Sequence, residues 1–184
     1  MPEELLQPLV DFYQANNQTL PIATRIEPEA MPQPHRQLLV HENDMTPTLE
    51  KYHGIELTLR PQRIVRGEDN LQRCVVLKDV DSERVIEFGA IVIQLAGFQW
   101  EIQEQIRGCK TPLGTILGQN KITHFCKPSA YFSLIADHAI ANALQIEAGV
   151  TLYGRRNGLT FPDGKPLADV VEILSPVAKD VVEN

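Results

Sequence analysis

The stretch "YGRRNGLTFPDGKPLADVVEIL", residues 153–174, decides the fold because it has the pattern of two strands joined by a turn. Its centre, "FPDGKP", carries the proline, aspartate and glycine of a tight turn, so the two strands are expected to pair as an antiparallel hairpin. In the second strand the side chains of Ala168, Val170, Glu172 and Leu174 share one face. The other three are apolar, so the carboxylate of Glu172 is expected to point toward the core.

Further strand-like segments extend this hairpin into a sheet. They are "GIELTLRPQRIV", "LQRCVVLKDV" and "RVIEFGAIVIQL", together with "GVTLYGRRNGLTF", which contains the first strand of the hairpin. Connections such as "KDVDSER" are too short for a crossover helix, so neighbouring strands are expected to run antiparallel. The predicted fold class is α+β, a single domain with a largely antiparallel sheet of about six strands flanked by helices.

Helices are predicted between the strands. Two begin with a Thr-Pro pair, in which threonine can cap and proline can open the helix: "TPTLEKYHG" from Thr46 and "TPLGTILG" from Thr111. The segment "FQWEIQEQI" is expected to form a third helix, and "YFSLIADHAIANALQI" is expected to be helical at its centre. These helices would cover the apolar faces of the sheet.

The whole chain, residues 1–184, is expected to form one domain. A chain of 184 residues with 43% hydrophobic and 22% charged residues is long enough for one core and short for two. Residues 1–37 are predicted to hold an amphipathic helix and an extended proline-rich segment, both packed on the body. The apolar side of that helix would carry Leu5, Leu9, Phe12 and Tyr13.

The composition restricts the partners of the chain. A formal net charge of −7 and a pI near 5.2 argue against a nucleic-acid backbone or an anionic membrane as the main partner. The apolar runs are too short to span a bilayer, and the start "MPEELL" lacks the basic and apolar parts of a secretory signal. A cytoplasmic location is therefore expected, without membrane insertion, and nothing in the sequence requires an oligomer.

The sequence lacks the usual signatures of metal, nucleotide and covalent chemistry. The histidines are scattered, and Cys74, Cys109 and Cys126 are too widely spaced for a disulfide framework or a C-x-x-C site. The string "GLTFPDGKP" has one residue too many before Gly-Lys for a phosphate loop, and a proline where serine or threonine would meet magnesium. There is no G-x-S-x-G elbow. No cofactor and no metal site is predicted.

A second inward charge accompanies Glu172. In "LQRCVVLKD" the side chains of Leu71, Arg73, Val75 and Leu77 share one face, so Arg73 interrupts an apolar row just as Glu172 does. One explanation is a buried ion pair between Arg73 and Glu172, or a face displaced by one residue. The other is a polar ligand held between the two charges. An aromatic acid suits that arrangement, with its carboxylate on the guanidinium and a distal hydroxyl on the glutamate.

The two Thr-Pro helix starts favour the ligand. Amides in the first turn of a helix have no intrahelical partner and lie at the positive end of the dipole, where an anion is favoured. Leu113 offers such an amide, and Met45, just ahead of the other start, offers a loop amide in similar fashion. The structural alternative is ordinary capping, with Met45 and Leu113 simply packed in the core.

Six segments, in order along the chain, resemble the chorismate lyases, which remove pyruvate from chorismate to give 4-hydroxybenzoate. They are "HENDMTPTLEKYHG", "LQRCVVLKD", "EFGAIVIQL", "KTPLGTIL", "YGRRNGL" and "GKPLADVVEILSP", and they cover roughly residues 38–176. A single word such as T-P-L-G is weak, but six in order with matching spacing are specific. The sequence is most similar to the branch found in cyanobacteria and plastids, which implies a role in quinone (plastoquinone or ubiquinone-type) biosynthesis.

The resemblance implies a carbon–oxygen lyase that needs neither metal nor cofactor and holds its ligand in a buried cavity. The family's contacts to bound product correspond to Met45, Arg73, Leu113 and Glu172 of this sequence. Arg73, with the Met45 and Leu113 amides, would bind the ring carboxylate, and Glu172 would bind the 4-hydroxyl. Arg73 and Glu172 would be the catalytic pair, and the partners would be the small molecules chorismate and 4-hydroxybenzoate.

The sequence departs from the family in two places. Classical bacterial members carry an arginine where this sequence has Ala90, and the segment 126–150 is longer than theirs. Arg155 and Arg156 are candidate contacts for the second carboxylate of chorismate, with solvated rim arginines as the alternative.

The family fold is also similar to effector-binding domains of bacterial transcription regulators. An aromatic-acid sensor without catalysis is therefore the second functional hypothesis. A sensor of that kind would normally carry a basic helix-turn-helix ahead of the domain, and the acidic N-terminal helix predicted here is not one.

Overall fold

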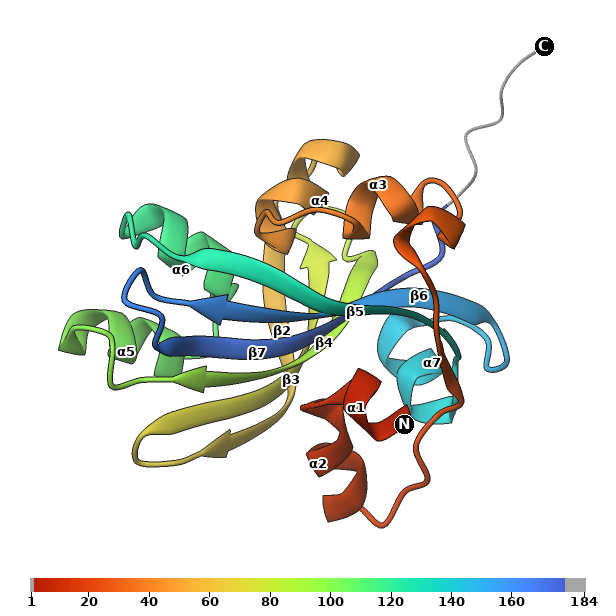
Figure 1. The fold of residues 1–184 in the computed structure, drawn as a ribbon, viewed down its shortest axis with the longest axis horizontal. Helices are drawn as coiled ribbons and strands as arrows, with labels where there is room; N and C mark the ends of the chain where they lie inside the picture. Colours follow the sequence, from red (N-terminus) through yellow and green to blue (C-terminus); the bar gives the residue numbers. More distant parts are fainter. Residues whose placement is uncertain (1, 178–184) are drawn as a thin grey trace.

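One antiparallel sheet of seven strands forms the centre of the protein (Figure 1). The computed structural model describes residues 2–177. The order across the sheet is β1-β5-β6-β7-β4-β3-β2, and every neighbouring pair runs antiparallel. The strands are β1 (Ala23–Arg25), β2 (Leu57–Arg66), β3 (Asn70–Asp79), β4 (Val85–Gln94), β5 (Phe125–Ile135), β6 (Thr151–Thr160) and β7 (Pro166–Leu174). The predicted α+β class with an antiparallel sheet is confirmed.

Helices fill the connections between the strands. They are α1 (Pro2–Leu6), α2 (Leu9–Ala15), α3 (His35–Leu39), α4 (Met45–His53), α5 (Trp100–Arg107), α6 (Leu113–Gln119) and α7 (His138–Leu144), with a short 3-10 turn at Pro28–Ala30. The first Thr-Pro pair lies inside the first turn of α4, and the second lies just before α6. Gly54 ends α4 with a φ of 65°, a left-handed conformation that glycine adopts without strain. None of the described helices combines the length and the apolar character needed to cross a membrane.

Strands β1 and β5 are not predicted by the sequence patterns. Strand β5 takes the first part of the segment 131–146, and α7 forms at its centre, where the helix was expected. Ala130, Phe132 and Leu134 of β5 are buried, and the residues between them are less buried. This alternation with a period of two is that of a strand. Strand β1 comes from the proline-rich segment and pairs with β5 at the edge of the sheet. Pairing with segments distant in the sequence therefore determines that both segments form strands.

The N-terminal residues form two short helices where one was predicted. Helix α1 ends at Leu6 and α2 begins at Leu9, with Pro8 between them. Proline cannot donate a hydrogen bond to the preceding turn, so it interrupts the helix at this point. The four apolar side chains expected to face the body are buried: Leu5, Leu9, Phe12 and Tyr13.

The two faces of the sheet have different coverings. Helices α1, α2 and α7 cover one face and pack on a continuous apolar cluster that includes Val76, Phe88 and Val171. On the other face α5 and α6 pack at one end and α3 and α4 at the other, forming two separate clusters. Figure 1 shows α3 and α4 on the opposite side of the sheet from α1, α2 and α7. Because strand side chains alternate, the central strands present different residues to each face.

Candidate ligand-binding cavity

A cavity lies on the face of the sheet that carries α4 and α6. Its wall combines the starts of these two helices with side chains of β2, β3, β4, β6 and β7. The space free of protein atoms, counted with its open mouth, is about 590 Å³. The apolar part of the lining is Leu59, Val75, Leu77, Ile91, Leu159 and Val170. An apolar concavity with a few inward polar groups is the usual form of a small-molecule site.

Arg73 of β3 is a cation of this cavity without a counter-charge. Its side chain is 1% exposed, and its Nε and Nη1 atoms have no hydrogen-bond partner among residues 2–177. No carboxylate of these residues lies within ion-pair distance of it, although the Cys109 thiol interacts with it. Burial lowers the pKa of the guanidinium, but arginine stays charged in proteins. The cavity is therefore electrostatically suited to an anion.

Glu172 of β7 reaches the same cavity and pairs with a different arginine. The Arg155 Nε atom donates to Glu172 Oε2 at 2.5 Å, and both side chains are buried. The ion pair between Arg73 and Glu172 that the sequence left open is therefore wrong. The Arg155 guanidinium also donates to the carbonyl of Leu39 at the end of α3 (3.2 Å) and to those of His41 (2.8 Å) and Asn43 (3.1 Å) in the loop before α4. Arg155 ties Glu172 to that loop.

The strand register keeps Arg73 and Glu172 apart. Arg73 lies opposite Ile91 of β4, and Ile91 lies opposite Val170 of β7, two residues before Glu172. With strands about 4.8 Å apart and a rise of about 3.4 Å per residue, the two Cα atoms are separated by roughly 12 Å. Gly89, directly opposite Glu172, has no side chain to fill the floor between them. A ring with substituents at opposite ends matches this spacing.

Met45 and Leu113 lie where the cavity meets the starts of α4 and α6. Their amides belong to the first turns of these helices and have no intrahelical partner. The two helix starts approach each other closely, because a Cβ added at Gly114 would lie 3.3 Å from the Thr46 hydroxyl oxygen. The side chains of Met45 and Leu113 are buried as well, so they also pack in the wall. Donation of the two amides to a ligand remains a prediction.

Two buried polar side chains on the central strands also line the cavity, and neither was predicted from the sequence. Glu87 of β4 is 5% exposed and Asn157 of β6 is 1% exposed. The Glu87 Oε2 and Asn157 Oδ1 atoms have no hydrogen-bond partner in the described part of the chain. Burial and the charge of Glu172 raise the pKa of Glu87 well above its ordinary value, against a smaller opposing effect of Arg155, which favours the protonated carboxyl.

Arg156 and Ala90 lie away from the cavity. Arg156 forms an ion pair with Asp169, with 2.7 Å between Nη2 and Oδ2, and donates to the Glu4 carbonyl at 2.8 Å. Ala90 is fully buried in the apolar cluster on the opposite face of the sheet. Neither Arg155 nor Arg156 belongs to the cavity lining, so their expected contact with a second carboxylate gains no support from the geometry.

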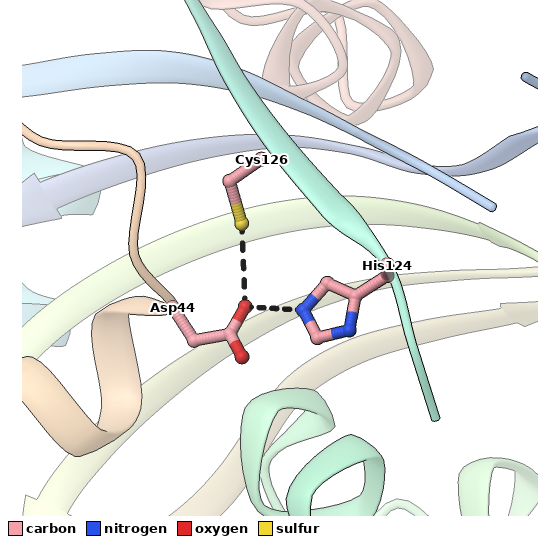
Figure 2. A group of neighbouring side chains, drawn as sticks. All are labelled: Asp44, His124 and Cys126. Carbon is pink, nitrogen blue, oxygen red and sulfur yellow. Dashed lines mark hydrogen bonds and ion pairs between the residues drawn. The ribbon is translucent and has the colours of Figure 1, made fainter. Parts of the chain in front are cut away.

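The fold also assembles a polar cluster from Asp44, His124 and Cys126 (Figure 2). The His124 Nε2 and Asp44 Oδ1 atoms are 2.8 Å apart, and the Cys126 thiol donates to the same oxygen at 3.3 Å. The other ring nitrogen of His124, Nδ1, lies 2.8 Å from the Ile122 carbonyl. The expectation that the histidines lie far from other metal-ligating side chains is wrong for His124, because β5 returns alongside the loop before α4.

Comparison with solved structures identifies a shared fold. The effector domain of PhnF from Mycobacterium smegmatis matches with a TM-score of 0.53 at 10% identity, over 72% of this chain and 88% of that one. A second PhnF structure from that organism matches with a TM-score of 0.54 at 11% identity, over 77% and 70% of the two chains. A gene product of Staphylococcus aureus matches with a TM-score of 0.51 at 9% identity, over 65% and 82%.

Comparison by sequence finds no match, either to the model of a protein family or to a curated protein. The chain shares its fold with these solved structures, among them the effector domain of PhnF. At these identities the structural likeness carries the fold alone.

Proposed function

We propose that the cavity binds a benzenoid carboxylic acid and that the protein is a chorismate lyase, which eliminates pyruvate from chorismate to leave 4-hydroxybenzoate. The observation that carries this proposal is Arg73, buried at the cavity without a counter-charge. A carboxylate that enters the cavity would supply the missing charge and accept hydrogen bonds from the guanidinium. The six ordered segments that resemble the chorismate lyases supply the identity of the acid.

The binding mode follows from the positions of the polar groups. Arg73 and the amides of Met45 and Leu113 hold the ring carboxylate, and Glu172 accepts a hydrogen bond from the hydroxyl at the other end of the ring. The separation of roughly 12 Å between the Cα atoms of Arg73 and Glu172 leaves room for the ring between their head groups. Arg155 keeps the Glu172 carboxylate in position through the bond at 2.5 Å.

The reaction is an elimination within one substrate molecule. The bond between ring carbon C3 and the ether oxygen breaks, the proton on C4 is removed, and the ring becomes aromatic. The departing enolpyruvate takes up a proton at its methylene carbon and becomes pyruvate, so atoms and charge balance. Aromatisation supplies much of the driving force. The protein fixes the substrate, excludes water with its apolar wall and stabilises the developing charge on the departing oxygen.

A non-catalytic sensor of aromatic acids is the second candidate, and the structural comparisons favour it. Two of the matched structures are of PhnF, and one of them is described as an effector domain. Such a domain would bind the acid through the same Arg73 and Glu172 and release it unchanged. The ordered resemblance along the chain favours the lyase, because it includes both inward charges and both helix starts.

Incubation of the purified protein with chorismate separates the two candidates. The lyase predicts equal amounts of 4-hydroxybenzoate and pyruvate, formed well above the uncatalysed rate. Tight binding of 4-hydroxybenzoate without turnover would support the sensor. Neither binding nor turnover would refute both candidates.

A pair of arginine variants tests whether the cavity is the site. Arg73→Met removes the charge from the cavity and should weaken the binding of 4-hydroxybenzoate by about 2 to 4 kcal/mol and reduce turnover strongly. Arg156→Met removes a neighbouring arginine that lies away from the cavity, where it pairs with Asp169, and should leave both unchanged. Equal losses of binding and turnover in the two variants would show that the ligand does not bind at Arg73.

A further inference from the structure

The loop before α4 and the start of β5 direct three kinds of metal-ligating atom toward one point. A carboxylate oxygen of Asp44, a ring nitrogen of His124 and the sulfur of Cys126 all lie within 4.8 Å of one another. Figure 2 shows His124 and Cys126 reaching from the β5 segment toward Asp44, which lies at the end of its loop. That loop is itself held in place, because Arg155 donates hydrogen bonds to two of its carbonyls, those of His41 and Asn43.

The main chain leaves the correct nitrogen of His124 available to a metal. The Ile122 carbonyl can only accept a hydrogen bond, so Nδ1, 2.8 Å away, carries a proton. Nε2 then faces Asp44 and Cys126. A hydrogen bond from one ring nitrogen to a carbonyl is the usual support for a histidine that binds metal through the other, because it fixes both the tautomer and the ring orientation.

The spacing of the three atoms is close to that of a tetrahedral site. Zinc bonds of about 2.0 to 2.1 Å to nitrogen and oxygen, and about 2.3 Å to sulfur, place neighbouring ligand atoms about 3.3 to 3.6 Å apart. The Cys126–Asp44 separation is 3.3 Å and the His124–Asp44 separation is 2.8 Å. The sulfur–oxygen pair must widen by about 0.3 Å and the nitrogen–oxygen pair by about 0.5 Å to reach these values. The third separation, between His124 and Cys126, is at most 4.8 Å.

We propose that Asp44, His124 and Cys126 bind a zinc ion at the rim of the cavity. A set of one sulfur, one nitrogen and one oxygen ligand favours zinc over magnesium or calcium, which prefer oxygen ligands alone. An open cleft borders the three side chains, so an ion can enter and a water molecule can complete the tetrahedron. The cleft is also lined by Glu42, Asn43, Pro47 and Phe125.

The zinc site is independent of the proposed lyase reaction, which routes no step through a metal. Asp44 nevertheless lines the ligand cavity as well as the open cleft. It immediately precedes Met45, whose amide is proposed to face the ligand. A bound ion would therefore fix the start of α4 against β5 at the point where the two sites meet.

Zinc titration of the untagged, reduced full-length protein in competition with a chromophoric chelator tests the proposal. One ion should bind per chain, and Cys126→Ser or His124→Gln should weaken binding by at least about 100-fold, more than the loss of an outer hydrogen bond to a metal ligand causes. His138→Gln changes an exposed histidine and Cys74→Ala a buried cysteine on the other face, so both should bind zinc as wild type does.

Cobalt substitution gives a second readout that does not depend on the stability of the variants. Wild-type protein loaded with Co²⁺ should show a thiolate-to-metal charge-transfer band, and Cys126→Ser should lack it. Thermal melts establish that each variant is folded. Equal zinc affinity in wild type and Cys126→Ser, or a cobalt-loaded wild type without the thiolate band, would overturn the proposal and leave a hydrogen-bonded Asp–His–Cys cluster.

Discussion

Two arginines of the sheet are buried to the same extent in opposite electrostatic surroundings. Arg73 is 1% exposed and Arg155 is 0% exposed. Burial alone would lower the pKa of either group. For Arg155 the charge and hydrogen bond of Glu172, with smaller effects of Cys126 and Glu87, together outweigh burial and raise the pKa. Arg73 has no carboxylate within ion-pair distance among residues 2–177, and burial lowers its pKa. We infer from this difference that Arg155 supports the structure of the site, whereas Arg73 is available to bind the ligand.

The largest effect should follow the loss of Arg155. Arg155→Met leaves Glu172 buried without its cation and releases the loop before α4. The free energy of unfolding should fall by about 3 to 5 kcal/mol, as is usual when one partner of a buried ion pair is removed. Denaturant unfolding without ligand measures the change. Wild-type stability in this variant would show that Arg155 is not part of the scaffold.

Removal of Arg73 should weaken ligand binding strongly and affect the stability of the fold little. Arg73→Met deletes a buried charge that has no protein counter-charge, so stability without ligand should be unchanged or higher. The affinity for 4-hydroxybenzoate should fall by about 2 to 4 kcal/mol, because the carboxylate loses its charged donor. Calorimetric titration measures the affinity. A large loss of stability with intact affinity would place Arg73 in the scaffold beside Arg155.

Glu172 pairs with Arg155 and also lines the cavity that contains Arg73. Comparing the binding of 4-hydroxybenzoate with that of benzoate separates its contact with the ligand from its contact with Arg155. Glu172→Gln keeps the size of the side chain but weakens its hydrogen bond to the ligand hydroxyl. The preference for 4-hydroxybenzoate over benzoate should shrink by about 1 to 2 kcal/mol, while benzoate affinity changes little. Equal losses for the two acids would show that the variant acts only through Arg155.

Local periodicity predicted a large part of this site. The alternation of side chains along β3 and β7 was sufficient to predict that Arg73 and Glu172 point inward, and both line the cavity. This prediction does not require knowing which strands lie beside β3 and β7. The same signal was present for Glu87, which interrupts the row of Gly89 and Ile91, and for Asn157. Neither was predicted, because the pattern favoured the pair of opposite inward charges, Arg73 and Glu172.

The partner of Glu172 required the register of the hairpin, which periodicity alone does not supply. The hairpin of β6 and β7 was predicted, and its observed register places Arg155 directly opposite Glu172. Arg73 lies on β3, with β4 between it and β7. Counting residues across the turn would have favoured Arg155.

The cluster of Asp44 and His124 could not be predicted from sequence patterns. The two residues are 80 positions apart and meet only because β5 joins the sheet. Strand β5 was itself not predicted, since the helical pattern of α7 extends toward it. Contacts of this kind depend on the order of strands across the sheet, which short-range periodicity does not contain.

The smallest predicted effect concerns the charge of Glu87, the carboxyl beside Glu172. Its pKa is raised above the ordinary value of 4.5 in the fold, so the unfolded chain loses this proton first as the pH rises. Stability is lost between that ordinary value and the folded pKa. Glu87→Gln has no such proton, so its stability relative to wild type should increase as the pH rises above about 4.5.

The free energy of unfolding of wild type and Glu87→Gln is measured with denaturant at each pH. In the difference between the two values, the contributions of all other titrating groups cancel. A constant difference between the two proteins would show that Glu87 keeps its ordinary pKa and is charged in the fold. The cavity would then hold two carboxylates, Glu87 and Glu172, against the charges of Arg73 and Arg155. Arg73 would be balanced by the protein's own charge, and the contrast between the two arginines on which the anion site rests would fail.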